Sequence, residues 1–356
     1  MKVAVAMSGG VDSSVAAYLL KEKKYDICGV TFKIKRDGGF LDKIDSSCLS
    51  NDDIDFARAI AERLSIPYYV LNYGDNFRRD VVDNFIRVYR EGGTPNPCID
   101  CNRYVKFGAL LRECDNLGYD KIATGHYARI EKDVSSGRYL LKRAKDAHKD
   151  QTYVLYTLGQ EQLAKTLLPL GEYTKDEIRE IAHENGFENA KRQDSQDICF
   201  VPDGKYAEFI EEYTGKKDEI GDFVDSEGNV LGPHKGIMHY TIGQGKQLGI
   251  AIGRKAFVTE IDPKTRRITL GDNDALYRRE LVAGDVNIIV ADRLDVKTRV
   301  TVKIRYSAKE APAFAFQDEA GLLHIEFDEP VRAITKGQSV VMYDGDIVVG
   351  GGKILG

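Results

Sequence analysis

The chain has 356 residues, of which 42% are hydrophobic and 30% charged, and its formal net charge is −5. This length suits two or three domains, and the composition is ordinary for a soluble globular protein. No apolar run reaches the ~18 residues that a membrane helix needs. The N-terminus has a buried-strand pattern rather than that of a signal peptide, so we expect a cytoplasmic protein with no membrane partner.

The first distinctive stretch is SGGVDSS, at residues 8–14. An apolar run of strand length precedes it, and apolar residues recur at helical spacing after it. Gly9 and Gly10 let a ligand approach the backbone, and the first N–H groups of the helix would attract an anion. A phosphate is the natural ligand. The alternative is a tight turn whose glycines only ease packing, because the stretch matches neither the Walker pattern nor GxGxxG.

Further strands are expected at residues 26–33, 67–72 and 120–124, alternating with helices at 52–64, 77–89 and 105–117. This alternation predicts an α/β doubly wound parallel sheet, with the glycine stretch at its carboxyl edge. Gly125 and His126 follow the fourth strand at that edge. Short helices are expected at 150–158 and 175–185, and two prolines predict an irregular loop over 94–102.

The character of the sequence changes near residue 203, where glycine-rich segments begin, and β alternation dominates beyond residue 275. There Val300, Val302, Ile304 and Tyr306 are predicted to share one face of a strand. We expect a small middle module followed by a C-terminal β-barrel. The predicted domains are residues 1–202, 203–271 and 272–356. Two basic clusters could contact RNA or could be solvated faces, which is the commoner meaning of such runs. They comprise Lys142, Arg143, Lys145, His148 and Lys149, and Lys297, Arg299, Lys303, Arg305 and Lys309.

Six cysteines are present, and in a cytosolic enzyme an even number does not indicate a disulfide framework. Cys28 and Cys114 fall on apolar patterns, whereas Cys98, Cys101 and Cys199 fall on predicted loops. Two roles remain open for these three. One thiol could carry a persulfide sulfur that another releases by thiol–disulfide exchange. Alternatively, the three thiolates could hold an iron–sulfur cluster with one open iron.

Taken together, these motifs resemble the tRNA-specific 2-thiouridylases, a family of PP-loop ATP pyrophosphatases with an adenine nucleotide alpha hydrolase-like fold. The similarity extends over nearly the whole chain. It rests on SGGVDSS, GVTFK, NPCIDCN, ATGHYAR, KDQTYVLYTL, DSQDICF, GPHKG, IRY and PVRAITKGQS. It implies ATP-dependent thiolation of the wobble uridine, position 34, of tRNA. ATP with Mg²⁺ would adenylate the 2-carbonyl oxygen and release pyrophosphate, and sulfur would then replace that oxygen.

The resemblance also implies site residues. ATP would be bound by Ala6, Met7, Ser8, Gly9, Gly10, Val11, Asp12, Ser13, Phe32 and Gly125. Contacts to tRNA would come from Asn96, Pro97, Cys98, His126, Lys149, Asp150, Gln151, Arg305, Tyr306 and Gln338. Cys101 would be the nucleophile and Cys199 the persulfide carrier, with a disulfide between cysteines as a possible intermediate. The sulfur donor would be a cysteine desulfurase, a persulfide relay protein or free sulfide.

Several positions depart from the family pattern. Cys98 stands where the best-known members have Asp, which makes a three-cysteine set with Cys101 and Cys199 and favours a [4Fe-4S] cluster as the alternative sulfur carrier. Gly245 replaces an arginine and Gln247 replaces a glycine, which weakens one expected RNA contact. No second basic residue follows Arg305 and Tyr306, which weakens the expected basic face there. Two other functions stay open: a different ATP-dependent ligase of this class, and a non-catalytic RNA-binding protein.

Overall fold

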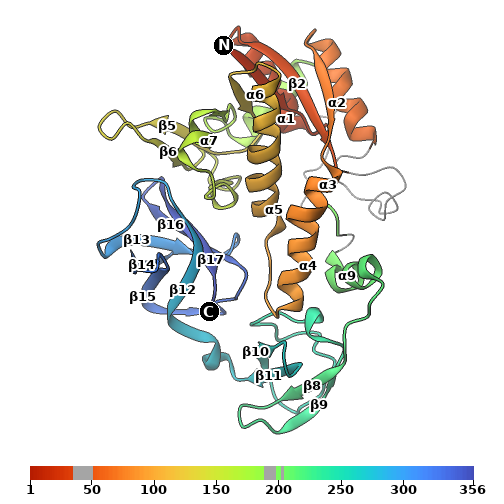
Figure 1. Cartoon of the computed structure of the whole chain (residues 1–356), viewed down its shortest axis with the longest axis vertical. Helices are drawn as coiled ribbons and strands as arrows, with labels where there is room; N and C mark the ends of the chain where they lie inside the picture. The colour runs from red at the N-terminus through yellow and green to blue at the C-terminus, as the bar shows by residue number, and fades with distance from the viewer. Residues whose placement is uncertain (35–50, 188–197, 202–203) are drawn as a thin grey trace. The chain divides into compact units, whose positions relative to one another are not determined.

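The computed structural model describes residues 1–34, 51–187, 198–201 and 204–356. They divide into two compact units, each interrupted in sequence. The first unit comprises Met1–Val81, Cys98–Gly204 and Asp346–Val348. The second comprises Val82–Pro97, Lys205–Gly345 and Val349–Gly356. Figure 1 shows their elements, and each unit is described by itself.

A parallel sheet forms the centre of the first unit and confirms the predicted fold class. Its strands are β1 (Lys2–Ala6), β2 (Asp26–Lys33), β3 (Tyr68–Asn72), β4 (Lys121–Ala123) and β7 (Thr166–Leu167). Their order is β3-β2-β1-β4-β7, and every neighbouring pair is parallel. Strand β1 is central, and Val3 and Val5 on it have no exposed surface. A central position explains why its sequence is continuously apolar.

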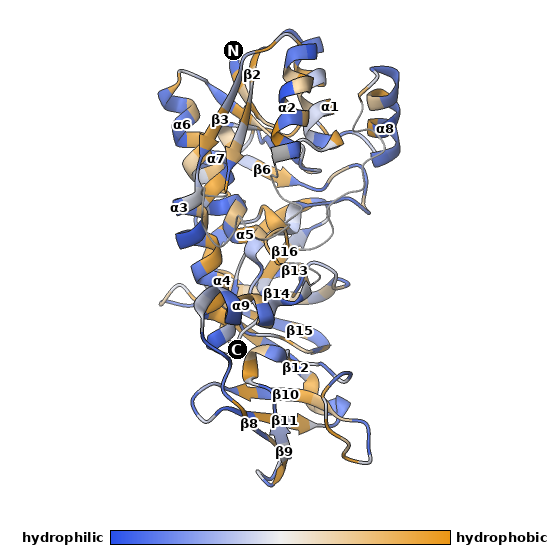
Figure 2. Cartoon of the chain, turned by 90° about the vertical axis from the view of Figure 1, so that its right-hand side faces the viewer, coloured by the Kyte–Doolittle hydropathy of each residue, from blue (hydrophilic) through white to orange (hydrophobic). Residues whose placement is uncertain are grey.

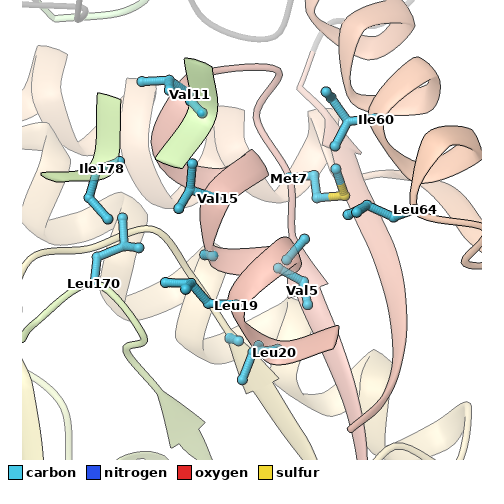
Figure 3. Packing of buried hydrophobic residues seen from close by; sticks show 14 of the residues in the cluster. Val5, Met7, Val11, Val15, Leu19, Leu20, Ile60, Leu64, Leu170 and Ile178 are labelled. Carbon is cyan, nitrogen blue, oxygen red and sulfur yellow. The ribbon is translucent and has the colours of Figure 1, made fainter. Parts of the chain in front are cut away.

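Alternate residues of β1 join helices α1 (Val11–Glu22), α2 (Asn51–Arg63) and α8 (Lys175–Glu184) in one apolar cluster (Figure 3). Helix α8 begins with a capping box, in which Thr174 accepts from the Glu177 N–H and the Glu177 side chain accepts from the Thr174 N–H. Its remaining surface is charged, and Figure 2 shows it largely blue. Cys28 lies beside Ala4 on the opposite face of the sheet from Val3, because strand side chains alternate.

Two helical stretches differ from the prediction because π-helical segments interrupt them. The first contains α3 (Gly74–Phe77), a π segment (Arg78–Val82) and α4 (Asp83–Arg90). The second contains α5 (Pro97–Asp100), a π segment (Cys101–Ala109) and α6 (Leu110–Asn116). The predicted loop over 94–102 is therefore wrong from Pro97 onward. A proline at the first position of a helix is tolerated, because its missing N–H would have had no intrahelical partner.

The remaining elements of the first unit are short. Strands β5 (Arg129–Lys132) and β6 (Tyr139–Lys142) form an antiparallel pair, and α7 (Gln160–Ala164) precedes β7. The helix predicted over 150–158 is only a 3-10 turn at Thr152–Val154. The part of the chain that the structure describes contains no helix long and apolar enough to cross a membrane.

The described residues of the second unit include helices α4 and α9 (Tyr206–Thr214) and two β modules. Helix α9 precedes a sheet of order β10-β11-β8-β9, built from β8 (Gly221–Val224), β9 (Val230–His234), β10 (Phe257–Asp262) and β11 (Arg267–Gly271). Short 3-10 turns lie at Ile237–His239 and Asn273–Leu276. Strands β11 and β8 are parallel, and the other pairs are antiparallel.

The predicted C-terminal β-barrel is confirmed. Its strands are β12 (Tyr277–Ile288), β13 (Thr298–Lys303), β14 (Ala311–Gln317), β15 (Leu323–Arg332), β16 (Ser339–Asp344) and β17 (Ile347–Ile354). The order β12-β15-β14-β13-β16-β17 is closed by pairing of β12 with β17. Val300, Val302 and Ile304 face the core as predicted. Tyr306 does not, because β13 ends at Lys303, and its side chain is 44% exposed.

Candidate nucleotide and thiol site

The glycine stretch forms the turn between β1 and α1 at the carboxyl end of the central strand. Gly9 has φ +76°, and a Cβ there would lie 2.4 Å from the carbonyl oxygen of Asp53. Only glycine fits both the conformation and the space. Gly10 is the N-cap of α1 and contributes no side-chain cap, so the helix presents backbone N–H groups at this turn. An uncapped N-terminus at the carboxyl edge of a parallel sheet suits a phosphate.

The serine hydroxyls hold the turn in shape. The Ser13 hydroxyl donates to the Gly10 carbonyl at 3.0 Å and accepts from the Ser8 N–H at 3.1 Å. The Ser14 hydroxyl donates to the same carbonyl at 3.1 Å. Ser13 and Ser14 are buried, whereas Ser8 is exposed. Of these hydroxyls, Ser8 is therefore the one whose position on the surface suits contact with a ligand.

The side chain of Asp12 is the hub of a contact network that the sequence did not reveal. The Lys175 ammonium donates to both of its carboxylate oxygens at 2.8 Å, and the Tyr127 hydroxyl donates to one at 2.7 Å. Lys175 is 4% exposed, so its charge needs this counter-ion. The sequence hints at this network through the Thr174–Glu177 capping box, which starts a helix at Lys175. A lysine is unfavourable there, because the N-terminal end of a helix carries positive partial charge.

The segment after β4 passes against the first turn of α1. A Cβ on Gly125 would lie 2.9 Å from the Ser13 nitrogen, so glycine is required for this approach. His126 is buried, and its Nδ1 forms a 2.7 Å hydrogen bond with the Thr124 hydroxyl. Burial, and then repulsion from Lys106, lowers the pKa of His126 well below its usual 6.5. The ring is therefore neutral at physiological pH.

Other predicted ligands of the first unit are fixed by neighbouring backbone. Phe32 lies near the carboxyl end of β2 and is buried, and the adjacent Thr31 hydroxyl donates to the Met7 carbonyl at 2.6 Å. Asp150 accepts hydrogen bonds from the Ala144 N–H at 3.0 Å and the Thr152 hydroxyl at 2.6 Å. Gln151 accepts from the Tyr127 N–H at 2.9 Å. Lys149 precedes this pair in the sequence, and these hydrogen bonds fix the positions of Asp150 and Gln151.

The three predicted functional thiols lie in the first unit, in different environments. Cys98 is on α5 and exposed, whereas Cys101 begins the following π segment and is half-buried. A π segment is frequent at functional sites. The neighbouring Asn102 is 1% exposed and donates to the Val154 carbonyl at 3.0 Å. Its Oδ1 is buried and accepts no hydrogen bond from the described residues, which leaves an acceptor beside Cys101.

Cys199 lies in a turn that is anchored by its neighbour. Phe200 packs edge-on against Phe77 of α3, with ring centroids 5.5 Å apart, and Phe200 is 3% exposed. Cys199 itself is half-buried. Most of the predicted DSQDICF segment, residues 194–197, lies outside the described residues. Helix α3 also contacts the π segment that begins at Cys101, so both thiols belong to segments that pack against the same helix.

Cys28 and Cys114 are structural, as the sequence predicted. Burial raises the pKa of the Cys28 thiol to about 11 and that of Cys114 to about 12. Neither is reactive at physiological pH, because the thiolate is the nucleophile. Within the described ranges no group of three His, Cys, Asp or Glu side chains is placed to hold a metal ion. A cluster held by Cys98, Cys101 and Cys199 is therefore not shown by the described residues.

In the second unit, hydrogen bonds join the segment that precedes Cys98 to the barrel. Gln338 donates from its amide nitrogen to the Thr94 carbonyl at 2.9 Å, and the Thr94 N–H donates to the Lys336 carbonyl at 2.8 Å. Asn96 is half-buried and Pro97 buried. Gln338, Arg305 and Tyr306 line one hollow of the second unit. The structure thus brings together the three predicted tRNA contacts of the barrel.

Several members of the predicted basic clusters are neutralised. Arg299 forms two hydrogen bonds with the Asp328 carboxylate, at 2.7 and 2.6 Å, and Lys297 pairs with Glu326. In the other cluster the bonds are Lys142–Glu131 at 3.0 Å and Lys145–Glu177 at 2.7 Å. For these residues the solvated-face interpretation accounts for the charges.

Two of the positions that depart from the family pattern, Gly245 and Gln247, lie in the middle module. Gln247 adopts φ +56°, a conformation that glycine adopts at less cost. A Cβ on Gly245 would lie 2.5 Å from the Phe257 ring. A long side chain at position 245 is therefore incompatible with the present place of that ring.

Family models match the chain in three consecutive blocks. The tRNA methyl transferase HUP domain matches residues 1–203, the tRNA methyl transferase PRC-barrel domain residues 207–272, and the aminomethyltransferase beta-barrel domain residues 278–354. With the glycine turn at the edge of a parallel sheet, these matches define the class: a HUP-type α/β domain followed by two β modules.

Full-length relatives identify the family within this class. The tRNA-specific 2-thiouridylase MnmA of Clostridioides difficile is 54% identical over 353 residues, which cover 99% of this chain and 98% of that protein. The proteins of the same name from Clostridium perfringens and Acetivibrio thermocellus are each 51% identical, over 99% of this chain and 98% and 99% of theirs. The chain belongs to the tRNA-specific 2-thiouridylase family.

A solved structure adds little to this assignment. A 4-thiouridine synthetase in complex with RNA and ATP matches with a TM-score of 0.35 and 18% identity, covering 60% of this chain and 50% of that chain. This similarity is too low to support an argument.

Proposed function

We propose that this protein uses ATP to activate the 2-carbonyl of the wobble uridine in tRNA and then replaces the oxygen with sulfur. The observation that carries the proposal is the Gly9–Gly10 turn, where a glycine-only conformation and an uncapped helix offer backbone N–H groups to a phosphate. The thiols of Cys101 and Cys199 lie in the same unit. The names of the full-length relatives support tRNA as the substrate.

In the activation step, the uridine O2 attacks the α-phosphorus of ATP and pyrophosphate leaves. The turn binds the β- and γ-phosphates, and the Lys175 ammonium neutralises Asp12 so that this carboxylate does not repel them. The rest of the ATP site comprises Ala6, Met7, Ser8, Val11, Ser13, Phe32 and Gly125. When bound, Mg²⁺ would neutralise phosphate charge through the nucleotide oxygens. The target base must leave its stack, and Asn96, Pro97 and Cys98 would receive it.

In the sulfur step, Cys199 carries a persulfide received from a donor protein. Its terminal sulfur attacks C2, and AMP leaves with the former carbonyl oxygen. The Cys101 thiolate then attacks the Cys199 sulfur, so the thiouridine leaves as a thiolate and a Cys101–Cys199 disulfide forms. A cellular dithiol must reduce this disulfide before the next turnover. The cytoplasm, with a cysteine desulfurase or persulfide relay protein as donor, suits this chemistry.

The test compares pyrophosphate release with and without unmodified tRNA and measures 2-thiouridine in the digested tRNA by mass spectrometry. We expect release to depend on tRNA, and thiouridine to disappear in both Cys101→Ser and Cys199→Ser. Pyrophosphate release should persist in both variants, because activation precedes sulfur transfer. Pyrophosphate release at the same rate with and without tRNA would instead indicate a ligase that acts on a small molecule. Full thiolation by Cys199→Ser would overturn the persulfide route.

The cluster alternative requires a separate measurement. Protein purified without oxygen should contain neither iron nor acid-labile sulfide and should thiolate tRNA from a persulfide donor. Four irons per chain, together with loss of thiolation on their removal, would replace the persulfide by a cluster-bound sulfide. A variant Cys98→Asp separates the routes further, because it removes one cluster ligand while leaving Cys101 and Cys199 intact.

A further inference from the structure

The hollow of the second unit has a volume of about 560 Å³, which falls in the range of small-molecule pockets. Its lining includes Arg305, Tyr306, Arg332, Gln338 and the turn at residues 241–244. This lining contains two arginines, several hydroxyls and no Asp or Glu. In a chain with a net charge of −5, a hollow of this composition is a local site for an anion.

Arg332 is held in place by neutral groups only. Its Nε donates to the Asn273 side-chain oxygen at 2.9 Å, and an Nη donates to the Gly243 carbonyl at 3.2 Å. The guanidinium also lies 5.1 Å from the centroid of the Phe257 ring. Neither Arg332 nor Arg305 forms an ion pair with a carboxylate of the described residues, in contrast to Arg299. Their charges therefore remain available to a ligand.

The turn that faces Arg332 is rigid. The Gly243 N–H donates to the Val258 carbonyl at 2.8 Å, and the Thr241 N–H donates to the Gln244 side chain at 3.1 Å. Gly243 has φ +86°, and a Cβ there would lie 2.8 Å from the Ala333 Cβ. A substitution at Gly243 would therefore disturb the wall of the hollow. A wall fixed in this way favours a preformed site.

We propose that Arg332 extends the tRNA contact expected of Arg305 and Tyr306, so that this hollow binds one nucleotide of the substrate tRNA with both guanidinium groups on its phosphodiester and Tyr306 against its base. The new element is that Arg332 and the turn at 241–244 take part in RNA recognition, which neither the motifs nor the comparisons assign. The inference rests on the proposed function for the identity of the RNA. Guanidinium groups suit phosphate, and an exposed tyrosine suits stacking with an unpaired base.

The experiment measures binding of the full chain to unmodified tRNA by fluorescence anisotropy at several salt concentrations. Arg332→Gln and Arg305→Gln should each weaken binding about threefold to tenfold and lower the slope of log K against log salt by about one. Arg332→Lys should keep the wild-type slope, because it keeps the charge. The matched control Arg299→Gln should change neither quantity, since Asp328 already neutralises that guanidinium.

Tyr306→Phe should bind like the wild type and Tyr306→Leu about tenfold more weakly, because stacking needs the ring. A competition arm with inorganic phosphate distinguishes an RNA site from a site for the free ion. The proposal would be overturned if inorganic phosphate competes for binding while both arginine variants keep the wild-type salt slope of tRNA binding. If the variants match the wild type while pyrophosphate release still depends on tRNA, only this inference fails. If the wild type does not bind tRNA, this inference and the proposed function fail together.

Discussion

The turn at Gly9 and the hollow at Arg332 are both suited to phosphate, but they achieve this differently. In the first unit the anion-binding groups are backbone N–H groups, and the nearby charges of Asp12 and Lys175 cancel within the protein. In the second unit the binding groups are guanidinium side chains without carboxylate partners in the described structure. The first arrangement depends on shape, and the second on uncompensated charge.

This difference matches the two ligands that we propose. A nucleotide that reacts must be held in one geometry, and backbone groups at a helix terminus are the least mobile donors available. A long polyanion such as tRNA is attracted mainly through its phosphates, so its binding should depend on salt. The following experiments challenge this contrast, beginning with the largest expected effect.

Gly9→Ala should reduce tRNA-dependent pyrophosphate release at least about 100-fold, because the turn must move away from Asp53 and the phosphate is displaced. Gly118→Ala is the matched control. Gly118 has a similar φ of +79° but no heavy atom within 4 Å of its Cβ position. It should lose about 1 kcal/mol of stability and keep its activity. Equal losses of activity in the two variants would contradict the dependence on shape.

Lys175→Met should lower the free energy of unfolding by about 3 kcal/mol, the lower end for a broken buried pair. The lower end applies because Asp12 keeps 29% of its side chain exposed. ATP affinity, measured by calorimetry, should fall at least about tenfold, since Asp12 then faces the phosphates uncompensated. The double variant Asp12→Asn, Lys175→Met should recover both quantities in part. If ATP affinity stays low in the double variant, Lys175 contacts phosphate directly.

Raising salt from about 50 to 200 mM should weaken tRNA binding about threefold for each phosphate contact, and therefore more than tenfold overall. ATP binding to the same protein should weaken less, because charges in a partly buried site are screened less. Anisotropy and calorimetry on one preparation give both numbers. Parallel salt dependences would remove the distinction between the two sites.

His126 makes the stability of the first unit depend on pH. Its pKa in the folded protein lies below 6.5, so the unfolded chain binds the proton more readily. Stability should therefore be full above about pH 6.5 and fall by up to about 1.4 kcal/mol per pH unit below it. His126→Gln should flatten this fall in urea denaturation between pH 7.5 and 5.5. Burial also lowers the pKa of His234 in the second unit, so denaturation of the whole chain should keep a smaller slope in His126→Gln.

Much of the fold could be predicted from local patterns. The apolar run before Gly9 and the helical spacing after it place the turn, and alternation at Val300, Val302 and Ile304 predicts a barrel strand with a buried face. Local patterns failed where two signals conflicted. The prolines of residues 94–102 predict an irregular loop, yet Pro97 begins a helix, because the first helical position needs no N–H. Tyr306 fitted the alternation but lies beyond the end of its strand.

Adjacent residues suffice to predict a phosphate ligand at the first site, because glycine conformation and helix-terminus chemistry are local properties. Only the tertiary structure decided how the charges are balanced. Asp12 and Lys175 are 163 positions apart, and Arg332 meets the Gly243 carbonyl across 89 positions. Such pairs leave no periodic pattern in the sequence, because the two residues are far apart along the chain and meet only after folding. A buried charge needs a partner, but that partner can come from any part of the chain.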